Sequence, residues 1–436
     1  MTAGLVAVAL AWAAFSARAG QDDEILMAGA ASVEVSLPVG TPLAGYGGFP
    51  RRAWVPDVLG RHPYAFWFRP SLGVHDPLRV RALALESGEA RALWLTLDLV
   101  GIDPTLVAGL RERLRRRGQT YSALIVSASH THSGPGAYAE SALFGFVAID
   151  RLSPPIRTKI LDGLEEAAWR AEGAKMKAQI AVGSVSVTGI TESRVHEALD
   201  PELAVVKVTR TDGRPLALLW NYAIHGTALG RDNLLLSGDL MGDASARLER
   251  ETGVPALFVN GAVGDVSPRP RGWAGVQAAG QTLAAGALEA WRRARVEPGG
   301  VEVATGQVAL PSPALSVRNC VAGWAPTWMT VGLQEALPTS TDLVALRIAR
   351  TGWVTIPGEL ETRLGLDVKS TQWDRLGRVF IAGVSNDYLG YFLTPADYRK
   401  PSYIACASLY GERGGEVMRD AAVAALKRLD GGRTRR

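Results

Sequence analysis

The sequence is poor in features that several classes of protein require. Its 436 residues include only 2 cysteines and 6 histidines. Beyond residue 19 no apolar run is long enough to cross a bilayer, and no internal repeat or Gly/Ser-rich linker divides the chain. These absences exclude a repeat array and a multi-span membrane protein. They favour one domain over the two or three that the length allows.

Strong charge of one sign is also missing. The formal net charge is +4 at pH 7, and the arginine runs "RERLRRR" and "GGRTRR" contain no aromatic residues. Nucleic-acid binding usually needs a clustered basic patch, so these runs indicate solvated surface and no nucleic-acid partner is expected. With 47% hydrophobic and 21% charged residues, the composition is that of a folded protein with a large core.

Residues 1–19, "MTAGLVAVALAWAAFSARA", have the pattern of a signal peptide. The apolar stretch "LVAVALAWAAF" is too short to span a membrane, and "ARA" fits a small-x-small cleavage site. We therefore expect a secreted or periplasmic protein, with a retained N-terminal anchor as the alternative. In an oxidising compartment Cys320 and Cys406 either pair or remain as two buried thiols.

Strand-like apolar runs alternate with amphipathic helical patterns along the rest of the chain. The runs are "ALWLTLDLVGI" (92–102), "ALIVSASH" (123–130), "LALLWNYAIH" (216–225), "ALFVNGAVGD" (256–265), "GWVTIPGE" (352–359) and "RVFIAGVSN" (378–386). The helical patterns cover 104–118, 156–174, 276–295 and 416–432. This alternation predicts an α/β fold, with mixed β-sheets and packed helices.

Polar residues able to do chemistry follow several of these strand runs. His130 and His132 follow "ALIVSA", His225 follows "LALLWNYAI", and Glu359 follows "GWVTIPG". In α/β sheets, sites form beyond the carboxyl ends of strands. We therefore expect these side chains to converge on one site although they are far apart in the sequence.

The histidines and the glutamate form a possible metal-ligand set. In an extended backbone His130 and His132 would point to the same side, and His225 with Glu359 would complete a set of nitrogen and oxygen ligands suited to Zn²⁺ with one position open. The plainer alternatives are a turn whose histidines bond to the backbone and, for Glu359, a carboxylate at a helix N-terminus. In "GPG" (134–136), the glycines would let backbone N–H groups approach a ligand.

Two further segments are unusual. "GAVGDVSPRP" (261–270) holds Asp265 and Ser267 before a proline, which is either a local turn or part of the site. The segment 385–411 carries half of the ten tyrosines: Tyr388, Tyr391, Tyr398, Tyr403 and Tyr410. Phenols pack as aromatics, but they can also bind a metal or donate to an oxyanion. Trp54, Trp67 and Trp273 either line a lipid entrance or fill cores.

Taken in order, "SASHTHSGPG", "NYAIHGTAL", "SGDLMG", "GAVGDVSP", "IPGE" and the tyrosine segment ending "SLYG" resemble the motifs of the neutral (non-lysosomal) ceramidase family. The resemblance begins near "TPLAGYGG" (41–48) and runs to about residue 415. It implies a ceramidase-like catalytic domain over residues 30–436. It also implies one Zn²⁺ per chain and hydrolysis of the N-acyl amide of ceramide or a related lipid, by attack of metal-activated water.

The resemblance also assigns roles to individual residues. The metal ligands would be His130, His225, Glu359 and Tyr391, with Tyr388 as the alternative tyrosine. The catalytic residues would be His132 beside the metal, the serine Ser267, the arginine Arg194 and the pocket tyrosine Tyr403. Among them, His132 would donate to the leaving amine, and Ser267 would either orient the substrate or attack it.

The chain also departs from the family pattern. No β-sandwich domain of the kind usual in the family follows "SLYG", so that domain is expected to be absent. Gly226, Ala137 and Arg269 replace the usual proline, glycine and asparagine of three motifs. These departures leave three possible substrates: ceramide, another N-acyl lipid or a smaller amide. We also expect the protein to contact a membrane surface transiently. A metal-dependent ester or phosphoester hydrolase and a non-catalytic lipid-binding protein remain as alternatives.

Overall fold

The computed structural model describes residues 25–195 and 199–431. The signal peptide expected over residues 1–19 lies outside the described residues. None of the helices in the described part of the chain combines the length and the apolar character that a membrane span requires.

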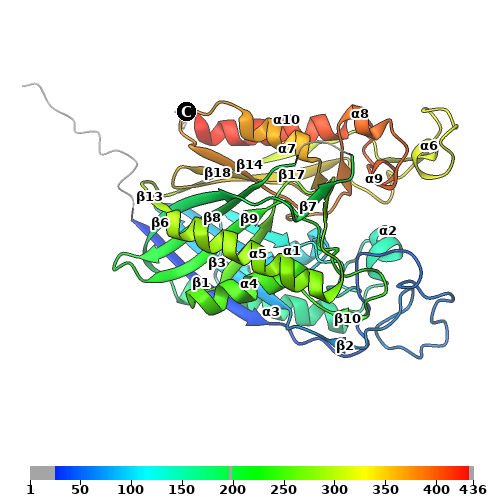
Figure 1. Ribbon diagram of the computed structural model, residues 1–436, viewed down its shortest axis with the longest axis horizontal. Helices are drawn as coiled ribbons and strands as arrows, with labels where there is room; N and C mark the ends of the chain where they lie inside the picture. The colour runs from blue at the N-terminus through cyan, green and yellow to red at the C-terminus, as the bar shows by residue number, and fades with distance from the viewer. Residues whose placement is uncertain (1–24, 196–198, 432–436) are drawn as a thin grey trace, which may run out of the picture.

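A nine-stranded mixed sheet forms the centre of the molecule (Figure 1). Its main order is β11-β9-β8-β6-β1-β3-β4-β5, and β13 pairs with β6. The strands are β1 (Leu26–Glu34), β3 (Arg79–Ser87), β4 (Ala90–Leu97), β5 (Ala123–Ala128), β6 (Met176–Ser186), β8 (Glu202–Arg210), β9 (Pro215–Tyr222), β11 (Ala256–Asn260) and β13 (Arg295–Glu297). The pairs β4·β5 and β9·β11 are parallel, and the other pairs are antiparallel.

Four long helices cover one face of this sheet. They are α1 (Pro104–Arg116), α3 (Pro154–Gly173), α4 (Asp239–Thr252) and α5 (Gly272–Arg293). Helix α1 begins where the Asp103 carboxylate accepts a hydrogen bond from the Thr105 N–H, and its last turn carries arginines, which suit the negative end of a helix. Because α1 connects β4 to β5 and α4 connects β9 to β11, each parallel pair is closed by a helical crossover.

A second sheet packs on the other face. It has the order β14-β17-β18-β20, formed by β14 (Val301–Ala309), β17 (Ser340–Ile348), β18 (Thr351–Thr355) and β20 (Arg378–Ala382). Alternate residues of the two sheets share one core, in which the Trp94 and Trp353 rings meet edge to face at 5.2 Å. Helices α7 (Thr362–Ser370) and α10 (Gly414–Asp430) cover the outer side, so the layers are helix, sheet, sheet, helix.

Short elements at one end of the sheets build the functional region. Four two-stranded pairs lie there: β10 (Leu235–Leu236) with β2 (Gly73–Val74), β12 (Val266–Pro268) with β7 (Thr191–Ser193), β15 (Ala314–Ser316) with β16 (Thr330–Gly332), and β19 (Glu359–Leu360) with β21 (Tyr391–Phe392). The short helices are α2 (Ala142–Phe144), η2 (Gly145–Ile149), α6 (Val317–Cys320), α8 (Pro395–Tyr398) and α9 (Tyr403–Cys406). A disulfide joins Cys320 to Cys406, so the cysteines pair.

The predicted α/β fold is confirmed, and each of the six strand runs and four helical patterns contains the expected element. Strands outside the six runs, such as β14, and helix α4 had not been predicted, whereas a helix after Glu359 had been considered and is present as α7. Helix α7 begins at Thr362 with Glu361 at its N-cap, so Glu359 lies on β19 before the helix and is not a helix-terminal carboxylate.

Candidate metal site and adjoining cavity

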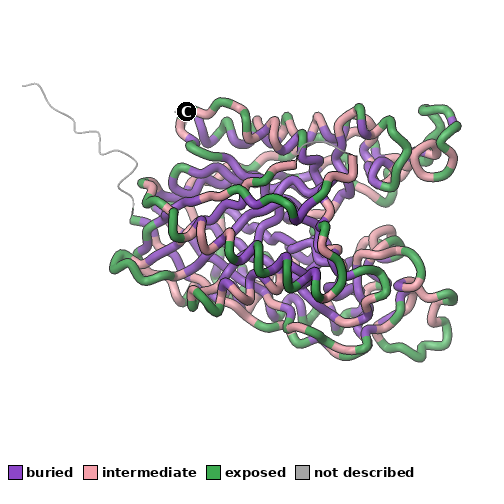
Figure 2. The backbone as a smooth tube through the Cα atoms, viewed as in Figure 1, coloured by how far each residue is buried: buried purple, intermediate pink, exposed green. Residues whose placement is uncertain are grey.

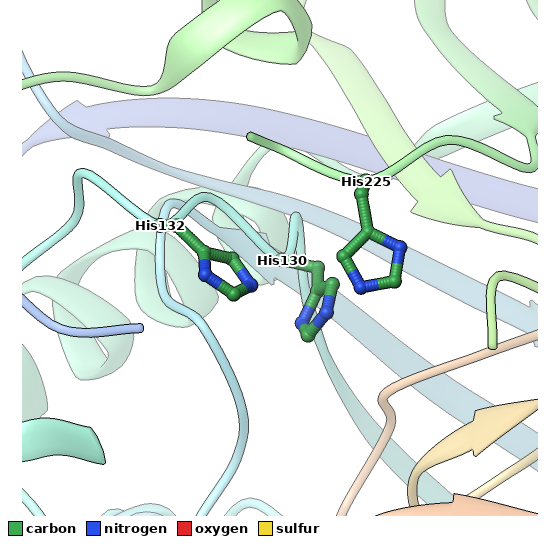
Figure 3. A group of neighbouring side chains, drawn as sticks. All are labelled: His130, His132 and His225. Carbon is green, nitrogen blue, oxygen red and sulfur yellow. The ribbon is translucent and has the colours of Figure 1, made fainter. Parts of the chain in front are cut away.

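The strand ends do converge, as the sequence predicted. His130 and His132 follow β5, His225 follows β9, and Glu359 lies on β19 just after β18. The side chains of His130, His225 and Glu359 are fully or almost fully buried. Figure 3 shows the three imidazoles facing a common point, and their ligand nitrogens lie within 4.8 Å of one another.

His130 is held by two backbone carbonyls. Its N–H donates to Leu99, and its Nδ1 lies 2.5 Å from the Val100 carbonyl oxygen. Because a carbonyl only accepts, Nδ1 carries the proton and Nε2 keeps a free lone pair. That Nε2 lies 3.3 Å from Oε1 of Glu359.

The expected extended backbone between His130 and His132 was wrong. His130 has φ of 66°, in the left-handed region that non-glycine residues rarely adopt. The two rings meet at 5.0 Å and 90° because the chain turns there. The turn is fixed by the segment that carries His225, since His132 N–H donates to the Gly226 carbonyl and Thr131 forms a parallel bridge with Gly226.

The role expected for "GPG" was also wrong. A Cβ at Gly134 would lie 2.5 Å from the Asp98 carbonyl oxygen, and one at Gly136 would lie 2.3 Å from the Ile149 carbonyl oxygen. Close packing against neighbouring backbone therefore requires these glycines. The Gly136 N–H donates to the carbonyl of Pro42, not towards the site.

Glu359 lies between the two histidines His130 and His225. Its Oε2 is 2.9 Å from Nε2 of His225. Burial alone would raise the pKa of Glu359, but the neighbouring imidazoles hold that pKa well below its usual range. Burial, helped by Arg194, lowers the pKa of His225 to about 3, so this imidazole is neutral at pH 7.

Several polar atoms of this cluster have no hydrogen-bond partner. They are Nε2 of His130, Nδ1 of His225 and both ring nitrogens of His132, and the close pair of Nε2 of His225 and Oε2 of Glu359 makes no aligned hydrogen bond either. Leaving a buried polar atom unsatisfied costs about 1–3 kcal/mol. A divalent metal ion with a preference for nitrogen and oxygen would bind one such atom from each ligand side chain, so the residues present fit such an ion.

Two tyrosines flank Glu359 and differ in their contacts. The Tyr388 hydroxyl donates to Oε1 of Glu359 at 2.5 Å. The Tyr391 hydroxyl accepts from Nη1 of Arg194 at 3.3 Å. Burial raises the pKa of both phenols well above the ordinary value. Tyr388 thus orients the carboxylate, and Tyr391, which also interacts with Glu359, holds its hydroxyl oxygen against the Arg194 guanidinium.

The pair β7·β12 brings Arg194 and Ser267 together. Nε of Arg194 donates to Oγ of Ser267 at 2.8 Å, and its guanidinium carbon lies 5.4 Å from the centre of the Tyr403 ring. Tyr403 is 61% exposed and so lies farther out than the other predicted residues. A guanidinium has no lone pair to take a proton, so this contact does not activate the Ser267 hydroxyl as a nucleophile.

A cavity of about 1180 Å³ adjoins the cluster. Its polar lining includes His132, Arg194, Glu359, Tyr388, Tyr391 and Tyr403, together with Ser141, Thr227, Arg231, Asp232 and Arg271. Its apolar lining comes from distant segments: Val100, Leu143, Phe144, Val147, Leu315, Leu333, Leu337, Leu389 and Leu409. This volume exceeds that of most small-molecule sites and suits a long apolar chain with one polar end.

Several residues that shape the site were not predicted from the sequence. Tyr46 packs edge-on against His132 with ring centres 5.0 Å apart. The buried Arg51 donates to the carbonyls of Ala44 and His132 and so fixes the His132 turn. The available signal was the glycine-rich "GYGG", in which an aromatic residue precedes two glycines.

The Asp265 carboxylate forms hydrogen bonds with a distant segment of the chain, not only within the local turn considered for it. Its Oδ1 accepts hydrogen bonds from the N–H and the hydroxyl of Thr362, each at 2.7 Å. The "GDVSP" segment is thereby bound to the start of α7, next to the strand that carries Glu359. Asp265 therefore helps to position Ser267 and Glu359 relative to each other.

Fold and site together define an α/β protein with a histidine-carboxylate cluster at the polar end of an apolar cavity. The model of the neutral/alkaline non-lysosomal ceramidase family, N-terminal, matches residues 62–284. The chain belongs to this family, as the resemblance predicted.

Individual relatives agree with this family assignment. Neutral ceramidase A of Dictyostelium discoideum is 23% identical over 78% of this chain, and the match covers 66% of that protein. The neutral ceramidase of Mycobacterium tuberculosis is 27% identical over 46% of this chain and 36% of its own length. The crystal structure of the neutral ceramidase from Pseudomonas aeruginosa matches 94% of this chain and 75% of that chain with a TM-score of 0.81 at 17% identity, which shows a common fold.

Proposed function

We propose that the protein is a zinc-dependent amidase that hydrolyses the N-acyl amide of ceramide or a related N-acyl lipid. The observation that carries the proposal is the buried set of unpartnered nitrogen and oxygen atoms at the polar end of the apolar cavity. Family membership and the relatives described above, which are neutral ceramidases, support the same chemistry.

The metal would be held by His130, His225, Glu359 and Tyr391. Three of these side chains offer buried atoms without hydrogen-bond partners, and Tyr391 presents its hydroxyl oxygen beside them. A zinc ion in such a site supplies Lewis acidity towards an amide carbonyl and lowers the pKa of a bound water molecule. Tyr388 would orient Glu359, and the Val100 carbonyl would fix the tautomer of His130.

The other polar residues would act on the substrate. Burial lowers the pKa of His132 well below its ordinary value, so this neutral imidazole on the cavity wall would first take up the proton released by the attacking water and then pass it to the leaving amine. The Arg194 guanidinium reaches Ser267 and Tyr391 and lines the cavity, where it would stabilise negative charge on the reacting carbonyl oxygen. Ser267 and Tyr403 would position the polar end of the substrate.

Two further features support the proposed substrate and compartment. The leucine and phenylalanine lining would bury the hydrocarbon part of the lipid, at about 0.8 kcal/mol per CH₂. The Cys320–Cys406 disulfide is typical of an oxidising compartment, which supports the proposed export.

A substrate screen tests this proposal. Purified protein with zinc is given an N-acyl sphingoid base, a matching fatty-acid ester and an aryl phosphoester, and mass spectrometry follows the products. We expect release of fatty acid and free amine from the amide, and loss of this activity with a chelator. Turnover of the phosphoester without the amide would contradict the proposal and favour the phosphoesterase alternative.

A further inference from the structure

Two loops of the molecule carry large apolar side chains in water. Rim loop 1 is residues 46–59, with Phe49, Trp54, Val55, Val58 and Leu59 exposed, and Trp54 is 83% exposed. Rim loop 2 is residues 317–332, with Val321, Trp324, Trp328, Met329 and Val331 exposed, and Trp324 is 87% exposed. Soluble surfaces rarely gather so many large apolar residues in contiguous segments.

Both rim loops adjoin the cavity described above. Rim loop 1 starts with Tyr46, Gly47 and Gly48, which line the cavity. Rim loop 2 lies between Leu315 and Leu333, which line it too. Figures 1 and 2 show the two segments at the same end of the molecule, the α6 segment above and the blue segment before β2 below, both largely exposed.

Rim loop 2 is fastened to the core in this projecting position. Its Cys320 is bonded to Cys406 of α9, which lines the cavity, and its Asn319 side chain donates to the Tyr398 carbonyl at 3.0 Å. The tryptophans Trp324 and Trp328 therefore project from a fixed base. They do not fold back onto a core of their own chain, as their exposure shows.

Rim loop 1 is fastened as well and carries positive charge. The Arg52 guanidinium lies 4.6 Å from the centre of the Phe146 ring, and the Ala53 N–H donates to the Trp67 carbonyl at 3.0 Å. Just beyond the loop, Arg61 and Arg69 are exposed. Exposed arginines beside exposed tryptophans complement a surface with an apolar interior and phosphate groups at its boundary.

We propose that rim loops 1 and 2 dock the protein on a lipid bilayer, with the cavity mouth facing the membrane. Tryptophan prefers the boundary between hydrocarbon and water, where its ring is buried and its N–H stays solvated. The proposal rests on the proposed function in one respect, because a lipid substrate has to leave a bilayer to enter the cavity. A second copy on this face would cover the cavity mouth, which disfavours self-association as its purpose.

Vesicle co-sedimentation tests this docking surface. The full mature chain is mixed with vesicles made of equal parts phosphatidylcholine and phosphatidylglycerol, and the bound fraction is measured against lipid concentration. We expect the wild type to bind. The Trp54→Ala variant on rim loop 1 should weaken the partition coefficient about tenfold, which corresponds to about 1.4 kcal/mol. The Trp324→Ala/Trp328→Ala variant on rim loop 2 loses two indoles and should weaken it about a hundredfold.

Trp169→Ala is the matched control. Trp169 is 48% exposed but belongs to α3, on the helical face of the first sheet, so its loss should leave vesicle binding unchanged. Thermal unfolding of each variant checks the fold. If the double variant misfolds, Trp54→Ala still tests the docking proposal, because it lies on the loop without the disulfide.

Three results would overturn the proposal: no vesicle binding by the wild type, equal binding by all variants, or a solution dimer that dissociates in the double variant. The last would assign the face to a second copy of the chain. Because the assay needs neither turnover nor a metal, its failure is distinguishable from failure of the proposed amidase function.

Discussion

At the scale of single residues, the site depends on buried groups whose partners lie far away in the sequence. His130 shows how a correct prediction can have an incorrect premise. Its proximity to His132 was expected from strand alternation, yet the backbone turns at φ of 66°. The sequence could not exclude that Glu359 is a carboxylate at a helix N-terminus, because only the structure shows that α7 begins later, at Thr362. Tyr46 was missed because its partner, His132, lies in a distant segment.

Ser267 provides a residue-scale test of mechanism. Its hydroxyl contacts the Arg194 guanidinium at 2.8 Å, which cannot act as a base. We therefore expect Ser267→Ala to lower kcat/KM by about tenfold to a thousandfold, as for a lost positioning or oxyanion contact. Steady-state kinetics on the N-acyl lipid measure this. Loss of about a millionfold, as on removal of a covalent nucleophile, would contradict the assignment.

Asp239 provides a test of stability against pH. Burial raises its pKa to about 7 from 3.8, and it accepts hydrogen bonds from the N–H groups of Leu229 and Leu240. Between these two pH values the folded chain holds a proton that the unfolded chain has released. The free energy of unfolding should therefore fall as pH rises from about 4 to about 7, by at most about 4 kcal/mol from this group.

Asp239→Asn should remove this contribution, since an amide oxygen can keep one of the hydrogen bonds and asparagine tolerates the positive φ of 55°. Denaturant titrations at pH 4, 5.5 and 7 measure the slope. The exposed Asp420→Asn is the control and should keep it. A slope unchanged in Asp239→Asn would show that other groups control the pH dependence.

At the scale of elements, strand ends were the strongest signal in the sequence. The runs that became β5, β9, β11 and β18 were recognisable because they are short, apolar and followed by polar residues. Strand β14 escaped detection because only its first residue is buried and the others are half-buried or exposed, so it has no apolar run. The rim loops have no periodic pattern, so their placement at the cavity depends on tertiary contacts that local sequence does not encode.

The contribution of the disulfide to stability can be tested directly. Cys320 and Cys406 are 86 residues apart and join α6 to α9. Removing such a cross-link relaxes the unfolded chain, so Cys320→Ser/Cys406→Ser should lower the free energy of unfolding by about 2–4 kcal/mol. Denaturation of the variant beside the oxidised wild type measures this. Equal stability of the two would show that α6 and α9 are held by packing alone.

At the scale of the whole molecule, two sheets and two helical layers place one polar cluster at the end of one apolar cavity. The layered core is made of residues distributed over most of the chain, which is why no single motif predicts the cavity. Its polar end was predictable from the ordered motifs. Its apolar walls were not, because they come from loops such as those carrying Leu143 and Leu337.

The metal content of the purified protein tests the central claim most directly. Elemental analysis would compare the wild type with His225→Ala, and with His75→Ala as a control, since His75 lies outside the cluster and stacks on Trp273. We expect about one zinc per chain in the wild type and in His75→Ala, as for a single catalytic site, and its loss in His225→Ala. A wild type that binds no metal even after zinc is supplied would rule out the zinc-dependent mechanism.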